Sequence, residues 1–338
     1  MRISPAFLAL SFALPMAFAC GKPSGERQTV TLLNVSYDPT RELYKEIGER
    51  FSAHYKAKTG RTVVVKSSHG GSAAQARSVL GGLKADVVTL ALAPDIDILA
   101  RHGLLRPDWQ QAFPNNSSPY TSAIVFLVRT GNPKQIRSWE DLARPGVAVI
   151  TPNPKTSGGA RWNFLAAWGH ITRNGGDAAQ AEDFVRRLYA NAPVLDTGAR
   201  GATTTFVRKK IGDVLIAWEN EAHLAVREFA EDRFEIVYPP DSIRAEPPVA
   251  IVDKNVAVNG TADIARAFIE YLYTDEAQEA MGRWYYRPSN PAILEKFRQT
   301  LPPFRKLFTI AEVAGTWTEA QKNFFDDGGV FDRLYAPK

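Results

Sequence analysis

The fold is indicated most clearly by residues 29–92, which read TVTLLNVSYDPTRELYKEIGERFSAHYKAKTGRTVVVKSSHGGSAAQARSVLGGLKADVVTLAL. Short apolar runs alternate in this stretch with amphipathic patterns of helical period. The expected strands are 30–35, 62–66 and 86–92, and the expected helices are 40–56, 73–83 and 95–102. Such a β-α-β-α-β order predicts a mostly parallel sheet covered by helices.

A second series of the same kind starts near Val147 and runs to Val237. Residues 123–128 follow a polar loop and residues 249–252 follow a proline-rich segment, as strands that cross between two lobes would. The sequence therefore predicts an α/β protein of two lobes, each a mostly parallel sheet flanked by helices. We expect a ligand cleft between the lobes, at the carboxyl ends of the strands. The expected division is residues 28–122 plus 246–338 for lobe I and 123–245 for lobe II.

The N-terminus has the pattern of an export signal. Arg2 precedes an apolar stretch, residues 6–19, which is too short to span a bilayer. Ala17-Phe18-Ala19 fits the small-x-small pattern of signal-peptide cleavage. We therefore expect residues 1–19 to be a signal peptide and the protein to be periplasmic.

Two interpretations of Cys20, the only cysteine, stay open. After simple cleavage it is a free thiol. In a lipoprotein it is acylated, and residues 20–27, which contain Gly, Pro and Ser, form a linker or tether to the membrane. Ala19 fits a lipobox, whereas Ala17 departs from the commoner leucine. A single cysteine forms no internal disulfide.

Composition excludes several classes of protein. The chain has 338 residues, is 45% hydrophobic and 23% charged, and carries a net charge of +5, as an ordinary globular protein would. The basic residues do not gather along a helix face, so nucleic-acid binding is not expected. No metal-ligand spacing is present, and we expect no metal and no cofactor.

Four predicted strands are followed by short polar turns that open a helix. The turns are SYDPTRE (36–42), SHGGSAA (68–74), KTSGGAR (155–161) and TGARGAT (197–203). The start of a helix presents free N–H groups and carries about half an elementary positive charge, so several starts aimed at one point suit an anion. One such turn is usually an ordinary helix cap, but four of them after strands favour an oxyanion site.

The residues around these turns resemble the bacterial periplasmic sulfate-binding proteins, over a range from Thr29 almost to the C-terminus. The stretches that carry the resemblance are LNVSYDPTREL (33–43), SHGGS (68–72), DVVTLALA (86–93), TPNPKTSGGARWN (151–163), GDVLIAWEN (212–220) and FFDDGG (324–329). The resemblance implies a two-lobed solute-binding fold of type II that closes on its ligand about a hinge. It also implies a monomer that serves the permease subunits of an ABC importer of sulfate or thiosulfate.

The resemblance further implies that the anion is dehydrated and held by uncharged donors alone. The backbone donors would be Asp38, Ser72, Gly158, Gly159 and Ala199, and the side-chain donors the Ser157 hydroxyl and the Trp218 indole. The neighbouring charged or titratable residues are His69, Arg161 and Arg200. We expect these three to support the peptide groups behind the donors, the alternative being a direct salt bridge to the anion. Thr156 and Thr197 depart from the commoner serine without removing a donor.

A site made only of donors predicts selectivity. Sulfate only accepts hydrogen bonds at neutral pH, whereas hydrogen phosphate has an O–H that would be buried unpaired, at a cost of about 1–3 kcal/mol. The Asp38 carboxylate must then turn away, for example to cap its own helix.

Two competing functions fit parts of the sequence. Thiosulfate fits the same donors and remains the alternative ligand. A secreted esterase-like hydrolase could use Ser157 as a nucleophile, with His69-Gly70-Gly71 as an oxyanion hole. The Gly-x-Ser-x-Gly pattern of such enzymes is missing from the sequence, so we expect a binding protein and not an enzyme.

Overall fold

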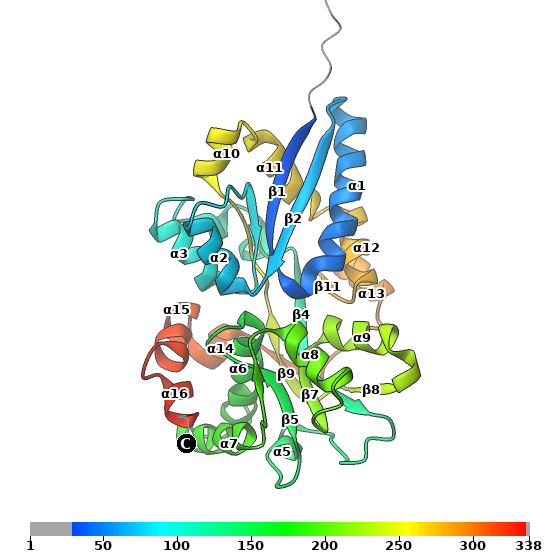
Figure 1. Cartoon of the computed structure of the whole chain (residues 1–338), viewed down its shortest axis with the longest axis vertical. Coiled ribbons are helices and arrows are strands. Elements are labelled where there is room, and N and C mark those ends of the chain that lie inside the picture. The colour runs from blue at the N-terminus through cyan, green and yellow to red at the C-terminus, as the bar shows by residue number, and fades with distance from the viewer. Residues whose placement is uncertain (1–28, 336–338) are drawn as a thin grey trace, which may run out of the picture.

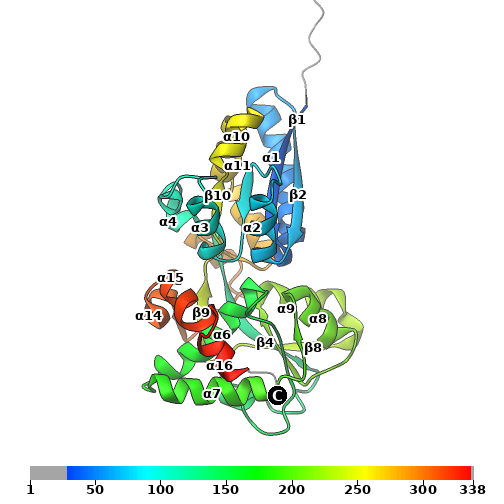
Figure 2. The same ribbon diagram turned by 60° about the vertical axis from the view of Figure 1, so that its left-hand side comes forward.

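The computed structural model describes residues 29–335, which form two lobes stacked along the long axis of the molecule (Figure 1). Lobe I lies at the top of the view and lobe II at the bottom, and the elements that join them pass through the middle. A view turned by 60° shows the same two bodies (Figure 2). Cys20 and the rest of the predicted signal and tether lie outside the described residues.

Within the described range, lobe I is built on a four-stranded sheet of order β10-β3-β1-β2. Strands β1 (Val30–Tyr37), β2 (Val63–Gly70) and β3 (Val87–Thr89) are parallel, while β10 (Val249–Ile251) runs antiparallel to β3. The long helix α1 (Arg41–Thr59) buries Leu43, Ile47 and Phe51, the face expected from their spacing. It ends at Gly60, whose φ of 71° is left-handed.

Lobe II is built on a larger sheet whose main path has the order β12-β9-β4-β7-β5-β6, with β8 and β11 also paired to β4. Strands β5, β6 and β7 are mutually parallel, so their carboxyl ends share one edge. The bounds are β4 (Tyr120–Arg129), β5 (Val149–Pro152), β6 (Leu195–Asp196), β7 (Val214–Trp218), β8 (Phe234–Val237), β9 (Asp241–Ala245), β11 (Arg287–Pro288) and β12 (Lys306–Phe308).

Helices flank both sheets. In lobe I and the segments next to it they are η1 (Asp38–Thr40), α2 (Ser72–Leu80), α3 (Ala93–Arg101), η2 (Trp109–Gln111), α4 (Pro114–Ser117), α10 (Asp253–Asn259), α11 (Ala262–Tyr271), α12 (Asp275–Arg283) and α13 (Pro291–Lys296). In lobe II they are α5 (Trp139–Leu142), α6 (Gly158–Thr172), α7 (Ala178–Ala190), α8 (Ala199–Val207), α9 (Glu219–Glu228), η3 (Ala230–Asp232), α14 (Ile310–Ala314), α15 (Trp317–Ala320), η4 (Gln321–Phe325) and α16 (Val330–Leu334). None of the described helices is both long and apolar enough to cross a membrane.

The C-terminal part of the chain differs from the expected division. We expected residues 246–338 to belong to lobe I, but β12 pairs with β9 of lobe II in parallel register, and the helices that follow pack on α6 and α7. The physical reason is aromatic packing: Phe324 lies 4.9 Å from Trp168 and Phe331 lies 5.4 Å from Tyr189, measured between ring centroids. The chain therefore crosses between the lobes a third time, between α13 and β12 (Figure 1).

Candidate functional site

Each of the four polar turns singled out in the sequence starts a helix at the carboxyl end of a strand. β1 leads into η1, β2 into α2, β5 into α6 and β6 into α8. The parallel strands β1 and β2 bring their turns to the lower edge of lobe I, and β5 and β6 bring theirs to the upper edge of lobe II (Figure 1). The helix starts therefore face one another where the two lobes meet.

Two glycines at the start of α6 mark where the lobes meet. A Cβ atom on Gly159 would collide with the Tyr37 hydroxyl of lobe I and would lie 3.2 Å from Nε1 of Trp218. A Cβ atom on Gly158 would lie 2.9 Å from that of Ala91, again in lobe I. Glycine is thus needed at both positions because backbone and side chains approach so closely.

Donors without partners gather at this meeting point. Nε1 of Trp218 and the hydroxyl of Tyr37 are both buried and have no hydrogen-bond partner among the described residues. Their rings lie 5.6 Å apart. Gly159, Ala199 and Trp218 line one small pocket on the lobe II side, so donors from α6, α8 and β7 face a common space. Buried polar groups are nearly always paired, so unpaired donors here point to a ligand that accepts hydrogen bonds.

Ser157 is the N-cap of α6. Its Oγ accepts a hydrogen bond from the Ala160 N–H at 3.4 Å, and its own N–H is bonded to the Asn153 carbonyl at 2.9 Å. The hydroxyl proton remains available for a ligand. Burial raises the pKa of Tyr37 well above its ordinary value, and the Ser157 hydroxyl and Gly159 N–H partly oppose that rise because they lie beside the phenol oxygen.

Ser72 uses its hydroxyl within lobe I. Its Oγ accepts from the Ala91 N–H at 3.0 Å and donates to the buried Asp95 carboxylate. The hydroxyl is therefore occupied, and Ser72 can offer a ligand its backbone N–H at the first position of α2. The resemblance assigned this same backbone group to the anion.

The Asp38 carboxylate is paired with a neighbouring cation and does not cap its own helix. It accepts a hydrogen bond from the Arg41 guanidinium at 2.8 Å, and the N-terminus of η1 has no side-chain cap among the described residues. The pair neutralises the carboxylate and leaves the Asp38 N–H at the start of η1. Asp38 can thus be a donor at the site without bringing an acceptor to it.

Glu221 is a carboxylate that the sequence reasoning missed. It is fully buried in the first turn of α9 and lines the same pocket as Gly159, Ala199 and Trp218. Burial raises its pKa to about 7, and the positive charge of Arg200 opposes this rise. Arg200 lies 3.2 Å from one carboxylate oxygen, and the Thr203 hydroxyl donates to the other at 3.2 Å. Oε1 accepts no hydrogen bond in the described structure, although the Arg200 guanidinium lies close to it.

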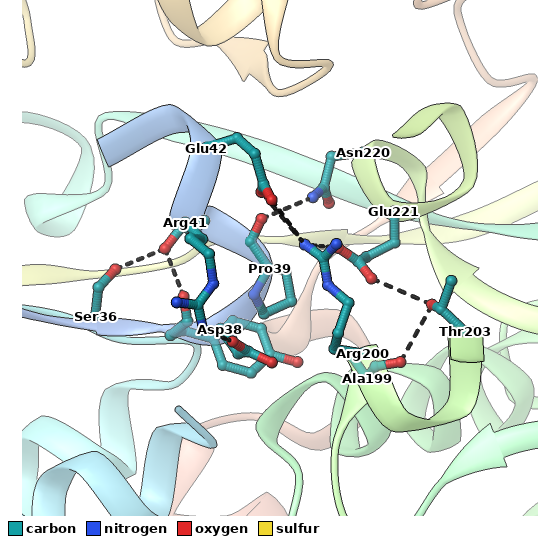
Figure 3. A network of polar contacts seen from close by, with 12 residues as sticks. Ser36, Asp38, Pro39, Arg41, Glu42, Ala199, Arg200, Thr203, Asn220 and Glu221 are labelled. Carbon is teal, nitrogen blue, oxygen red and sulfur yellow. Dashed lines mark hydrogen bonds and ion pairs between the residues drawn. The ribbon is translucent and has the colours of Figure 1, made fainter. Parts of the chain in front are cut away.

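Arg200 joins the two lobes at the edge of the site (Figure 3). Its guanidinium pairs with Glu221 of lobe II and, at 3.3 Å, with Glu42 of lobe I. Burial alone would lower its pKa, but Glu221 and Glu42 raise it by more. Asn220 forms a second link, from its side-chain amide to the Pro39 carbonyl at 3.3 Å. Arg200 is thus engaged by two carboxylates, which fits a supporting role.

Arg161 and His69 are the other two residues that were expected to support the donors. Arg161 donates to the Pro154 carbonyl at 2.9 Å, which braces the turn before α6, and to Gln321 at 2.8 Å. Burial, and then Arg41, lower the pKa of His69, so its neutral form is favoured. Among the described residues, the three groups expected behind the donors are therefore held by protein neighbours or kept neutral.

Two further aromatic residues belong to the site region. Tyr37 directly precedes Asp38, and its position at a strand end is the only sequence signal for it. Trp162 is buried in the core, and its Nε1 donates to the Ala91 carbonyl of lobe I at 3.0 Å. No cluster of three or more His, Cys, Asp or Glu side chains within residues 29–335 is placed to hold a metal ion.

Comparison with known proteins places this geometry in a family. The family model of the bacterial extracellular solute-binding proteins matches residues 32–287. The sulfate-binding protein of Escherichia coli K12 is 56% identical over 320 residues, covering 94% of this chain and 97% of that protein. The thiosulfate-binding protein of Pseudomonas aeruginosa is 49% identical over 335 residues, covering 99% and 98%. The solved structure of the sulfate-binding protein SubI from Mycobacterium tuberculosis superposes with a TM-score of 0.79 at 36% identity, covering 88% of this chain and all of that one.

Proposed function

Because the chain belongs to the bacterial extracellular solute-binding proteins, we propose that it captures sulfate between its lobes and delivers it to an ABC-type importer. It is a binding protein and not an enzyme. The observation that supports sulfate most strongly is the buried indole N–H of Trp218, which has no partner in the described part of the chain and lies beside the glycine turn of α6. An indole N–H only donates, so its partner must accept.

The proposed donors are the seven groups named from the sequence. Backbone N–H groups come from Asp38, Ser72, Gly158, Gly159 and Ala199, and the side-chain donors are Ser157 and Trp218. Four of the backbone donors stand at the first turns of α2, α6 and α8, where the helix ends add positive potential without a formal charge. A buried site strengthens every donor because the local dielectric is low.

Selectivity requires that neither carboxylate near these donors accepts a hydrogen bond from the ligand. Asp38 is paired with Arg41, and Glu221 is engaged by Arg200 and Thr203. The O–H of hydrogen phosphate would be left facing other donors, which costs about 1–3 kcal/mol or five- to 150-fold in affinity. Sulfate has no proton at neutral pH and meets no such cost.

Thiosulfate is the second candidate ligand. A relative that is 49% identical over nearly the whole chain carries the name thiosulfate-binding protein. Thiosulfate keeps three oxygens that the same donors can satisfy. Binding of both anions, with sulfate preferred, is the form of the proposal that the relatives favour.

The protein acts outside the cytoplasmic membrane, as its family does. We further propose that it works as a monomer, that its partners are the permease subunits of the importer and not nucleic acid, and that Cys20 tethers it to the membrane as a lipoprotein. Mass spectrometry of the native protein separates an acylated Cys20 from a free thiol.

Calorimetry tests the function. The protein expressed without residues 1–20 is titrated with sulfate, thiosulfate, phosphate and molybdate at pH 7. Tight sulfate binding with negligible phosphate binding is expected. Equal affinity for phosphate would defeat the donor-only mechanism, and tighter binding of thiosulfate than of sulfate would reverse the order of the two ligands.

A further inference from the structure

The C-terminal segment 316–334, here called the strap, is anchored in lobe II. It follows β12, which pairs with β9, and α14, which packs on α6. Within the strap, Phe324 contacts Phe164 of α6 at 5.7 Å between ring centroids, and Phe331 contacts Tyr189 of α7 at 5.4 Å. The strap therefore moves with lobe II whenever the lobes change their separation.

The strap holds the donor turn that opens α6. Lys155, at the start of this turn, donates to the Phe325 carbonyl at 2.9 Å and pairs with Asp332 at 2.8 Å. Arg161, in the first turn of α6, donates to Gln321 at 2.8 Å. The proposed donors Ser157, Gly158 and Gly159 lie between these two anchored residues. The strap thus fixes the turn from both of its ends without lying at the anion position.

The strap also reaches across to lobe I. Its helix α15 contacts α3, and both views show it directly beneath that helix (Figures 1 and 2). Trp317 packs against the hydrophobic cluster of lobe I that includes Ile96 and Leu99, and also against the cluster that includes Trp162. The Trp317 ring meets the Trp162 ring edge to face, with centroids 4.6 Å apart.

Trp162 connects Trp317 to one of the proposed donors of lobe I. Its Nε1 donates to the Ala91 carbonyl at 3.0 Å, and the Ala91 N–H donates to Oγ of Ser72, also at 3.0 Å. Ser72 is the residue whose own N–H is a proposed donor. Trp317, Trp162, Ala91 and Ser72 therefore form a continuous line of contacts from the strap to the start of α2. The Trp162–Ala91 and Trp317–lobe I contacts exist only while the lobes are together.

We propose that the strap is an interlobe clasp that sets the anion affinity by stabilising the closed form, with Trp317 and Trp162 as its positioning residues. This inference rests on the proposed function, because it concerns the affinity of the same site. The apparent dissociation constant rises as the fraction of closed protein falls, so loss of the clasp weakens binding although every donor to the anion is intact. Since the clasp forms only on closure, its loss acts mainly on the rate of anion release.

The test compares variants of two equally buried tryptophans. Trp162→Phe removes the N–H that bonds Ala91 across the lobes, and Trp139→Phe removes an N–H that bonds the Asp241 carbonyl inside lobe II, also at 3.0 Å. Trp317→Ala removes the aromatic contact, and Trp317→Phe largely restores it. Sulfate affinity is measured by calorimetry, and sulfate release by stopped-flow fluorescence.

We expect Trp317→Ala to weaken sulfate binding about tenfold, with a matching increase in the release rate, and Trp317→Phe to recover most of the loss. Trp162→Phe weakens binding about fivefold, on the scale of one hydrogen bond. Trp139→Phe lowers the melting temperature but leaves affinity and release within twofold of the wild type. Affinity and release within twofold of the wild type in Trp317→Ala, with only a lower melting temperature, would overturn the proposal.

Two further readouts keep the test decisive. If Trp317→Ala does not fold, Trp162→Phe carries the test, and unchanged affinity in that variant overturns the clasp. If the wild-type protein binds no sulfate, the proposed function fails, and the clasp is then judged by small-angle scattering of the free protein. A larger radius of gyration in the Trp317 or Trp162 variants supports the clasp, and an unchanged one overturns it.

Discussion

The two ends of α6 differ in whether the buried polar groups beside them have hydrogen-bond partners. At its N-terminus, Gly159 lies beside Trp218 and Tyr37, whose buried N–H and O–H have no partner in the described structure. Near its C-terminus, His170 is bonded on both ring nitrogens, to Asp241 at 2.9 Å and to Glu140 at 2.8 Å. Unpaired buried donors are costly and persist where a ligand completes them, whereas a fully paired cluster serves stability. The comparison predicts that changes at the first end alter binding and changes at the second alter folding.

The largest effect is expected from Gly159→Ala. The added Cβ would collide with the Tyr37 hydroxyl and crowd Nε1 of Trp218. Overpacking costs about 1–3 kcal/mol and a lost hydrogen bond to a charged group about 1.5–3 kcal/mol, so sulfate affinity should fall by about 1,000-fold in calorimetry. Gly198→Ala is the matched control, since no atom lies within 4 Å of its added Cβ. A large loss in that control as well would show that crowding at Gly159 is not the cause.

His170→Ala tests the other end of the helix. It leaves the buried Asp241 without its imidazole, and unfolding in urea should show a loss of about 3 kcal/mol in stability at pH 6. Sulfate affinity should stay within twofold of the wild type, because His170 contacts none of the proposed donors. A loss of sulfate affinity in His170→Ala larger than twofold would show that this end of α6 also affects binding.

The same cluster makes stability depend on pH. Burial alone would lower the pKa of His170, but Asp241 and Glu140 raise it above the ordinary value of 6.5. A raised pKa means that the stabilisation is fully present below pH 6.5 and is lost as the pH rises through the higher folded-state value. Urea unfolding from pH 5.5 to 9 should therefore show the wild-type advantage over His170→Ala shrinking with pH. If the stability difference between the wild type and His170→Ala grows with pH, the folded-state pKa of His170 is lowered and not raised.

Trp218→Phe keeps an aromatic ring at the site and removes its N–H. Loss of one hydrogen bond to a charged ligand, about 2 kcal/mol, should weaken sulfate about 30-fold. Because the N–H is unpaired in the protein itself, the melting temperature of the free variant should not fall by more than that of Trp139→Phe, whose indole is bonded. Unchanged affinity in Trp218→Phe would remove this residue from the site.

The smallest effect is expected at the edge of the site. Glu42→Gln breaks the interlobe ion pair with Arg200, and ion pairs that are partly open to water contribute about 0–1 kcal/mol. Sulfate affinity measured at low salt should fall by about twofold, and the difference should vanish at high salt. A tenfold loss would instead make Arg200 part of the binding machinery.

The positions of the polar turns were predictable from the sequence, whereas the contacts that support these turns were not. Strand-turn-helix patterns located the four polar turns, because strand ends and helix starts depend on neighbouring residues, whereas the individual donors within them were implied by the resemblance alone. The turns did not predict the first residue of each helix: α8, for example, begins at Ala199, inside the turn 197–203. A helix start is hard to place when Gly, Ala and Arg all tolerate the first turn.

The supporting contacts join segments that are far apart in the sequence and were not predictable from local pattern. Arg161 meets Gln321, 160 residues away in the sequence, and Arg200 meets Glu42, 158 residues away. Tyr37 reaches the start of α6 only because two separately folded sheets face each other. The C-terminal segment was assigned to the wrong lobe for the same reason, since short elements such as β12 do not show which sheet they join.

The most direct test is a crystal structure of the protein with selenate, a tetrahedral dianion whose selenium is located by anomalous scattering. The account predicts selenium between the start of α6 and the Trp218 indole, with its oxygens accepting from the N–H groups of Gly159 and Ala199 and from Nε1 of Trp218. Selenium held by the guanidinium of Arg200 or Arg41, away from these uncharged donors, would contradict it.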